Sequence, residues 1–436
     1  MTGGGIHHIT VSGFKSIRNE QSIEIKPLTI LAGANNSGKS SMMQPLLLLK
    51  QTLEATYDPG PLLLNGPNVH FTSTEQLLAQ LANGKRASFF EVEIVLRPFF
   101  SCKLTFKKKG AGGFQIARMI LGRKYEGQER RLVLQEGMSH KEIITELLSF
   151  GTGREVAMKV LDQLEHQSHK LAVIRKRCFL DIENAQGISP TISIFGDLFI
   201  CQIIHLPGLR GNPERSFPVT AVGPMFPGTF QEYMASIIAQ WQAEKRSGNL
   251  LLLGKYLEKL GLTWKVSAKA INDAQVELQV GRLPHSAKSG AADMVNIADV
   301  GFGVSQVLPV LVALLVAEPG QLVYMEEPEI HLHPRAQSAM AEILADAAKR
   351  GVRVVIETHS QLLLLGIQTL VAKGSLSPDL VKLHWFQRGD DGSTKITSTD
   401  LDEAGAFGDW PEDFAEVALE AESRYLDAAE SQQTIN

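Results

Sequence analysis

Cysteine is scarce in this sequence of 436 residues, and long apolar runs and a strong net charge are absent. It has three cysteines, Cys102, Cys178 and Cys201, without any C-x-x-C spacing, so neither a disulfide scaffold nor a cysteine zinc site fits. The first residues lack a signal-peptide pattern. No apolar run reaches the roughly 18 residues of a membrane helix, and the nearest is residues 307–316. We therefore expect a reduced, cytoplasmic protein with no membrane segment.

Charge is unevenly distributed along the chain. The net charge of −4 gives no overall case for nucleic-acid binding. Residues 101–180, however, hold 16 Lys and Arg against 8 Asp and Glu, whereas residues 400–436 hold 1 against 11. The basic clusters are candidate contacts for DNA phosphates, and solvated faces of strands and helices explain them at least as well. These clusters are residues 107–109, 130–131 and 175–177.

The most informative stretch is residues 28–41, which reads as an apolar strand, a glycine-bounded loop and the start of a helix. The loop fits G-x-x-x-x-G-K-[ST] at every fixed position, a pattern whose backbone N–H groups cradle phosphates. Lys39 can reach the β and γ phosphates, and Ser40 can offer its hydroxyl to Mg²⁺. We predict ATP and Mg²⁺ as cofactors. The loop residues assigned to them are Gly33, Asn35, Asn36, Ser37, Gly38, Lys39, Ser40 and Ser41.

Two later strands end in the polar side chains that a phosphate-loop enzyme needs. Residues 321–325 are apolar and lead into Glu326 and Glu327. We assign Glu326 to the metal and Glu327 to the attacking water. The strand at 352–356 is followed by E-T-H-S. Its His359 is placed to reach a γ-phosphate, because ligands lie beyond the carboxyl ends of strands in open α/β sheets.

Three further segments carry weaker signals. Residues 299–307 place glycines and a hydroxyl just before an apolar helix, which makes either an anion site or an ordinary helix cap. Residues 205–216 form a loop with two arginines, and we weigh a phosphate or interface loop equally against one held by local salt bridges. His331 and His333 lie two residues apart in a turn without a cysteine partner, so zinc binding is not expected.

Taken together, these residues resemble the ABC-type ATPases of the RecF and SMC kind. The resemblance is strongest to stand-alone bacterial AAA-family ATPases related to the ATPase half of the overcoming-lysogenization-defect (OLD) nucleases. The matching stretches are G-F-K-S at 13–16, the loop at 33–40, V-G-F-G-V-S-Q at 300–306, E-E-P-E-I-H-L-H-P at 326–334 and E-T-H-S at 357–360. The acidic residues 408–414 are also similar to the tail of that group.

The resemblance implies a nucleotide site shared between two chains. Residues 300–306 would form a divergent signature motif on the γ-phosphate of ATP held by the other subunit. Two chains would then close head-to-tail around two ATP molecules, with Glu327 as general base, His359 as switch histidine and the turn at 331–334 at the dimer seam. The residues assigned to nucleotide contact in this way are Gly303, Ser305 and Gln306 from the signature and Lys15 and Ser16 near the base and ribose.

The sequence departs from the family pattern in three places. Glu326 stands where many ABC proteins have Asp, although this subgroup often has Glu. No glutamine can be assigned to a Q-loop, since Gln44 and Gln51 lie on the helix after the phosphate loop. Lys39 and Glu326 are 287 residues apart, much farther than in a transporter nucleotide-binding domain. With no membrane segment expected, this distance counts against a transporter.

The predicted fold class is α/β: a P-loop NTPase of the ABC-ATPase type with a mixed sheet, an antiparallel β layer and a helical insertion. Strands are predicted at 22–31, 89–96 and 101–106, and mostly helical stretches at 141–177 and 229–260. We divide the chain into the N-terminal part of the ATPase domain (1–100), an inserted β and helical region (101–290), the C-terminal part of the ATPase domain (291–390) and an acidic tail segment (391–436).

The predicted function is ATP binding and hydrolysis by an ABC-type ATPase whose nucleotide-driven dimerisation controls a DNA transaction or a separate effector nuclease, in anti-phage defence or DNA repair. The alternative is an ATP-dependent oligomeric scaffold or sensor that holds an effector inactive, with hydrolysis not needed for output. The expected partners are a second copy or higher homo-oligomer, an effector protein such as a nuclease, and DNA. About 80 residues follow the strand at 352–356, so no fused nuclease is expected.

Overall fold

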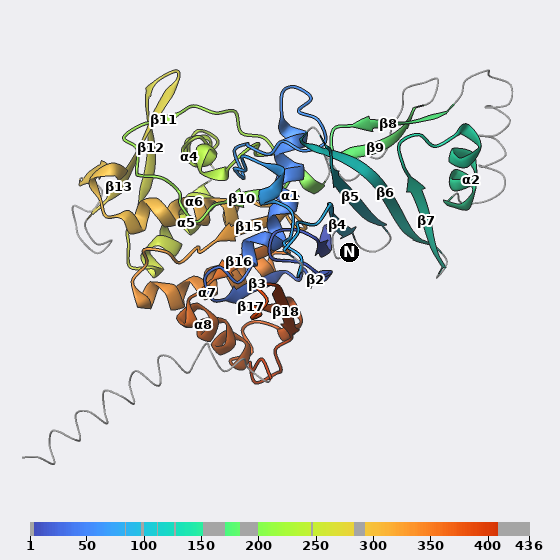
Figure 1. Cartoon of the computed structure of the whole chain (residues 1–436). Coiled ribbons are helices and arrows are strands. Elements are labelled where there is room, and N and C mark those ends of the chain that lie inside the picture. The colour runs from blue at the N-terminus through green and yellow to red at the C-terminus, as the bar shows by residue number, and fades with distance from the viewer. Residues whose placement is uncertain are drawn as a thin grey trace, which may run out of the picture.

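Two six-stranded sheets with a helix packed against both form the centre of the molecule (Figure 1). The structure is a computed structural model, and it describes residues 4–82, 84–96, 100–110, 112–125, 128–150, 171–183, 199–245, 247–282 and 293–408. The helix predicted within 151–170 and the acidic residues after 408 lie outside the described residues.

The first sheet carries the phosphate-loop strand. Its strands run parallel in the order β10-β15-β16-β3-β17, and β18 pairs antiparallel with β17 at one edge. Alternate side chains enter the cores on opposite faces, which explains the continuous apolar runs. The strands are β3 (Leu28–Gly33), β10 (Ile204–Leu206), β15 (Leu322–Glu326), β16 (Arg353–Thr358), β17 (Val381–Arg388) and β18 (Thr394–Thr399).

The second sheet is antiparallel, with the order β2-β1-β4-β5-β6-β7. The strand pair predicted at 89–96 and 101–106 is confirmed. The sheet continues across residue 100, so the predicted boundary between the first two segments falls inside one sheet. The strands are β1 (Ile6–Ser12), β2 (Gln21–Glu24), β4 (Phe89–Leu96), β5 (Phe100–Lys108), β6 (Phe114–Tyr125) and β7 (Gln128–Leu134).

Helices cover both faces of the parallel sheet. Helix α1 (Lys39–Glu54) follows the phosphate loop and packs Met42, Leu46 and Leu49 into the core shared by the two sheets. The helix continues through Pro45, although proline lacks the N–H that the ladder uses. The opposite face is covered by α6 (Phe302–Val316), α7 (Pro334–Lys349) and α8 (Gln361–Ala372).

Smaller elements extend the molecule at two ends (Figure 1). At one end lie α2 (His140–Phe150), β8 (Ala172–Lys176) and β9 (Phe179–Glu183). At the other lie α4 (Met234–Ala243), α5 (Ser247–Lys259), β11 (Phe217–Pro218), β12 (Val266–Asn272), β13 (Gln275–Gly281) and β14 (Met294–Asn296). Short 3-10 helices are η1 (Thr74–Gln76), η3 (Phe230–Tyr233), η4 (Ile297–Asp299) and η5 (Pro378–Leu380).

Three predicted elements need correction. The strand at 22–31 is two strands, β2 and β3, which belong to different sheets because the chain turns at Pro27. Residues 172–176 are strand rather than helix, since they pair with β9 in a hairpin. Residues 62–68, whose L-L-L-N-G-P-N sequence predicts a strand end and a turn, contain only an isolated bridge from Asn65. The helical stretch at 229–260 is confirmed, with a break between Ala243, where α4 ends, and Ser247, where α5 begins.

The predicted fold class is confirmed. A mixed sheet with a strand–loop–helix phosphate site, an antiparallel layer and helices in the region between its two halves are all present. Within the ranges the structure describes, every helix is too short or too polar to cross a membrane.

His384 on β17 is a buried imidazole that links stability to pH. Nε2 donates to the backbone carbonyl oxygen of Glu24 at 2.8 Å, because a carbonyl can only accept. Nδ1 then accepts from the Ser398 hydroxyl at 2.7 Å. Burial lowers the pKa of His384 to about 4, whereas the unfolded chain titrates near about 6.5. The unfolded state therefore binds more protons between these values. Stability is complete above about pH 6.5 and falls as the pH drops toward 4.

We expect this group alone to lower the free energy of unfolding by about 2 kcal/mol between about pH 7.5 and pH 5. Urea unfolding of the wild type and His384→Gln measures it. The variant is less stable at the higher pH, and the gap between the two proteins narrows as the pH falls. His70→Gln removes an exposed imidazole and keeps the wild-type pH dependence. A gap of constant size would contradict this role of His384.

Candidate active site

The phosphate loop joins β3 to α1 and requires glycine at both ends. Gly33 has φ +143° and Gly38 has φ +105°, a range that other residues rarely adopt. A Cβ on Gly33 would lie 2.2 Å from the Phe386 carbonyl oxygen, and one on Gly38 would lie 2.2 Å from Thr394 Oγ1. The glycines are therefore fixed by backbone conformation and by the β17–β18 hairpin packed against the loop.

Lys39 points back into this loop. Its Nζ donates to the carbonyls of Gly33 and Ala34, each at 2.9 Å, and lies 3.2 Å from His359 Nε2. Burial lowers the pKa of Lys39, and the charges of Glu357 and Glu327 oppose that shift. The ammonium group thus stands beside a cavity of about 530 Å³ that the phosphate loop shares with the carboxyl ends of β15 and β16.

Glu327 and His359 are in direct contact in this cavity. Glu327 Oε1 lies 3.2 Å from His359 Nε2. Glu327 has φ +46°, a strained backbone conformation that its neighbours hold, since its N–H donates to the carbonyl of Glu357 at 2.8 Å. Burial and the Lys39 charge lower the pKa of His359, and Glu327 opposes them. The arrangement suits a carboxylate base oriented by a neutral imidazole.

The predicted metal ligands lie on either side of a third carboxylate. Ser40 Oγ donates to Glu357 Oε2 at 2.8 Å. The Tyr324 hydroxyl donates to Glu357 Oε1 and lies 3.4 Å from Glu326 Oε1. Burial and the nearby Glu326 raise the pKa of Glu357 to about 7. Burial opposes ionisation of Glu326, but the adjacent His205 and hydrogen bonds from Gly208 N–H and Tyr324 lower its pKa.

These oxygen donors fit Mg²⁺, which takes one or two carboxylates together with water and substrate phosphates. Within the described ranges, no group of three or more His, Cys, Asp and Glu side chains is arranged as a metal site by itself. A cation beside Ser40 and Glu326 would therefore complete its shell from water and ATP.

The loop after β10 closes the site from the other side. Pro207, Gly208 and Leu209 line the cavity, and the Gly208 N–H donates to the Glu326 carboxylate at 3.2 Å. The buried Arg210 donates to the carbonyls of Glu326 at 2.7 Å and Glu327 at 3.2 Å, and burial lowers its pKa to about 10. Arg215, the second arginine of this loop, pairs with Asp299 at 2.6 Å. Both arginines therefore have partners within the protein.

The signature-like residues lie inside α6 rather than before it, because this helix begins at Phe302 with Gly301 as its N-cap. Ser305 Oγ donates to the Phe302 carbonyl at 3.0 Å, and Gln306 Nε2 donates to the Gly211 carbonyl at 2.8 Å. Neither they nor Gly303 line the phosphate-loop cavity. The exposed Phe302 ring lies 6.1 Å from the His331 ring, so the predicted seam turn adjoins this helix end.

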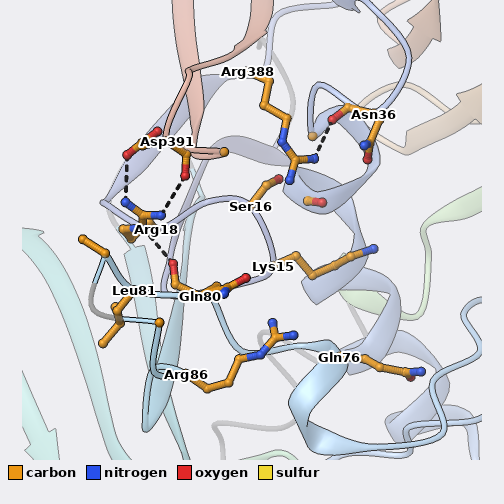
Figure 2. A pocket seen from close by; sticks show the side chains of 15 residues that line it. Lys15, Ser16, Arg18, Asn36, Gln76, Gln80, Leu81, Arg86, Arg388 and Asp391 are labelled. Atoms are coloured by element: carbon orange, nitrogen blue, oxygen red, sulfur yellow. Dashed lines mark hydrogen bonds and ion pairs between the residues drawn. The ribbon is translucent and has the colours of Figure 1, made fainter.

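Lys15 and Ser16 line a second cavity of about 710 Å³ beside the phosphate loop, as Figure 2 shows. Lys15 also borders the first cavity, where its Nζ donates to Gln44 Oε1 at 3.0 Å. Ser16 Oγ lies 2.8 Å from Thr394 Oγ1. Arg388 donates to the Asn36 carbonyl at 3.1 Å (Figure 2). The β17–β18 hairpin therefore forms a wall that no sequence pattern indicated.

The structure brings most of the predicted residues together and adds several more. Asn35, Asn36, Ser37, Gly38, Lys39, Ser40, Ser41, Glu326, Glu327, His359 and Lys15 line one cavity. The sequence patterns gave no role to Glu357 or Tyr324. They placed His205 and Arg210 in a loop for which a phosphate or interface role was one of two alternatives. A signal existed for Glu357, since it ends a predicted strand as Glu326 does, and the two residues are paired in register on β16 and β15.

Known proteins resemble this chain in the stretches that build the site. The family model "AAA ATPase domain" matches residues 5–107, which contain the phosphate loop. The model "AAA domain, putative AbiEii toxin, Type IV TA system" matches residues 250–365, which contain Glu326, Glu327 and His359. The "Old nuclease" of Escherichia phage P2 is 23% identical over 402 residues, covering 82% of this chain. The chain spans 56% of the length of that relative.

Solved structures of SMC heads are also similar. A head bound to the C-winged helix domain of ScpA has a TM-score of 0.46 at 15% identity, covering 92% of this chain and 99% of the other. The head domain from Thermotoga maritima has a TM-score of 0.37 at 11% identity, covering 91% and 100%. On the two family models, the chain is an ATPase with AAA-family ATPase domains, and it is similar to the Old nuclease of phage P2.

Proposed function

We propose that this ATPase acts in the cytoplasm as a head-to-tail dimer, in which each chain completes the nucleotide site of the other. One observation carries the proposal. Within one chain the phosphate loop, both carboxylates and His359 share a cavity that Gly303, Ser305 and Gln306 do not line. Gly301 and Phe302 at the start of α6 are exposed, and this helix end at the position of the signature motif supports a contact with the γ-phosphate bound by a second copy.

The chemical roles follow from the contacts of each side chain. Lys39 and the loop N–H groups bind the phosphates, and Ser40 and Glu326 hold Mg²⁺, whose charge offsets that of the phosphates. Glu327 accepts the proton of the attacking water as the water oxygen bonds to the γ-phosphorus. The bond from the γ-phosphorus to the β,γ-bridging oxygen breaks at the same time, and ADP is the leaving group. His359, 3.2 Å from Glu327, orients this carboxylate toward the water. Arg210 holds the backbone carbonyls of both glutamates and so fixes the end of β15.

We further propose that dimer closure controls a DNA transaction or a separate effector nuclease, in anti-phage defence or DNA repair. The name of the phage P2 relative supports a nuclease-linked output. We assign the DNA contact to the exposed Lys107 and Lys109, because several other cations of the basic region already have partners within the protein. Lys108 pairs with Glu75, Arg131 with Glu129 and Arg175 with Asp58, and Arg177 donates to the carbonyls of Thr52 and Tyr57.

A mixture of two inactive variants tests the shared site. Lys39→Met removes the phosphate ligand, and Gly303→Asp places a carboxylate at the second residue of α6. There the carboxylate is stabilised by the helix dipole, but it repels a phosphate of the partner's ATP. In a head-to-tail dimer, mixing the two gives one doubly mutated site and one site with neither mutation. We expect each variant alone to be inactive and the mixture to recover ATP turnover.

The control is a mixture of Lys39→Met with Glu327→Gln, whose mutations lie in the same half of the site. In that mixed dimer every site carries one defect, so turnover stays absent. Recovery in the control mixture, or none in the test mixture while both proteins stay folded, would contradict the head-to-tail arrangement.

A further inference from the structure

Glu357 is a buried carboxylate at the centre of the metal side of the site. Its exposed fraction is 4%, and it lies on β16 between Glu326 on β15 and Leu31 on β3. Its backbone carbonyl accepts the N–H of Glu327 at 2.8 Å. Burying a carboxylate costs free energy unless its oxygens are hydrogen-bonded, so both oxygens of Glu357 need hydrogen-bond donors.

Both oxygens of Glu357 accept a hydroxyl hydrogen. Ser40 Oγ donates to Oε2 at 2.8 Å, and Tyr324 donates to Oε1. The Tyr324 hydroxyl also lies 3.4 Å from Glu326 Oε1. Tyr324 is itself buried and stacks on His205, with an interplanar angle of 8°. Ser40, Glu357, Tyr324 and Glu326 therefore form one continuous chain of contacts.

This chain determines how Ser40 faces the nucleotide. A serine hydroxyl has one hydrogen and two lone pairs, so a hydroxyl that gives its hydrogen to Glu357 turns its lone pairs elsewhere. The phosphate-loop cavity, which Ser40, Glu326 and Glu357 all line, is where a cation bound to ATP would sit. Carboxylates that orient ligands in this way commonly tune the affinity of a metal site.

We infer that Glu357 is a positioning residue, held by the Tyr324 hydroxyl, which takes the Ser40 hydrogen so that the Ser40 oxygen is presented to Mg²⁺. The inference rests on the proposed Mg²⁺–ATP site. In Glu357→Gln an amide N–H₂ can face Ser40 and donate to it. The serine hydrogen then turns toward the cation and opposes its binding. The backbone bond from Glu327 is unchanged in this variant, so only the side chain is tested.

The experiment measures binding of a fluorescent ATP analogue at increasing Mg²⁺ concentration, without reference to turnover. Glu357→Gln is expected to raise the half-saturating Mg²⁺ concentration about 10- to 100-fold, with nucleotide binding in the absence of Mg²⁺ unchanged. In a Ser40→Ala background the same substitution is expected to add little, because Glu357 acts through that hydroxyl. A full additional effect there would overturn the positioning role.

Two further variants separate this role from general loss of a buried carboxylate. Glu329→Gln removes one that is also buried but accepts from Thr358 instead, and wild-type Mg²⁺ dependence is expected. Tyr324→Phe deletes only the linking hydroxyl and is expected to raise the half-saturating concentration by a smaller factor. If Glu357→Gln does not fold, Tyr324→Phe tests the positioning role in its place. Unchanged Mg²⁺ dependence in Glu357→Gln and Tyr324→Phe overturns the inference alone, whereas a wild type indifferent to Mg²⁺ contradicts the proposed site itself.

Discussion

Glu327→Gln is expected to lower ATP turnover at least about 100-fold while ATP binding persists. The substitution keeps the size of the side chain and removes the carboxylate that contacts His359 at 3.2 Å. No phosphate contact is assigned to Glu327, so the loop N–H groups and Lys39 still bind the nucleotide. ATP that is bound and not hydrolysed should then hold the dimer closed. Turnover and nucleotide affinity measured on the same protein separate the two effects.

Glu318→Gln is the matched control for this result. Glu318 lies just before β15, at the end of the strand opposite Glu327. It is exposed and borders neither cavity. It should leave turnover at the wild-type level. If Glu327→Gln kept most of the wild-type rate, another group would have to be the base, and the assignment of Glu327 would be wrong.

Lys39→Met is expected to weaken ATP binding about 100-fold or more, since each hydrogen bond to a charged group is worth about 1.5–3 kcal/mol and the ammonium has three donors. In the protein those donors are directed at the Gly33 and Ala34 carbonyls beside the cavity, ready to turn to the phosphates. Methionine has nearly the same length and no charge. Isothermal titration with ATP and Mg²⁺ measures the loss.

Lys26→Met provides the comparison, because Lys26 precedes the same strand at its opposite end and pairs with Asp400. It is expected to bind ATP as the wild type does. Equal ATP affinity in Lys39→Met and the wild type would show that the nucleotide does not occupy the phosphate loop, and it would remove the basis of the site.

The parts of the site that could be predicted are those fixed by local chemistry. The positive φ angles of Gly33 and Gly38 demand glycine whatever the rest of the chain does. The strands that end at Glu326 and just before His359 are apolar because both faces of the sheet are covered. Since the carboxyl ends of parallel strands share one edge, these residues meet near Lys39.

Other features depended on pairings between distant segments. Residues 172–176 have an unremarkable helix-compatible composition, and their hairpin with β9 decides that they are strand. The role of Arg210 requires that β10 pair with β15, which brings an arginine from a loop onto the carbonyls of Glu326 and Glu327. The link from Ser40 to Glu357 requires the register between β16 and β3. Spacing along the sequence contains none of this information.

The most direct test of the proposed function is ATP turnover per subunit against protein concentration, with the mass of the particle recorded on the same samples with and without ATP. A site completed by a second chain predicts that turnover rises with concentration and that ATP shifts the mass from one chain to two, most strongly in Glu327→Gln. A constant mass with negligible turnover in both proteins would contradict the shared site, and ATP would then serve a scaffold or sensor as a bound ligand.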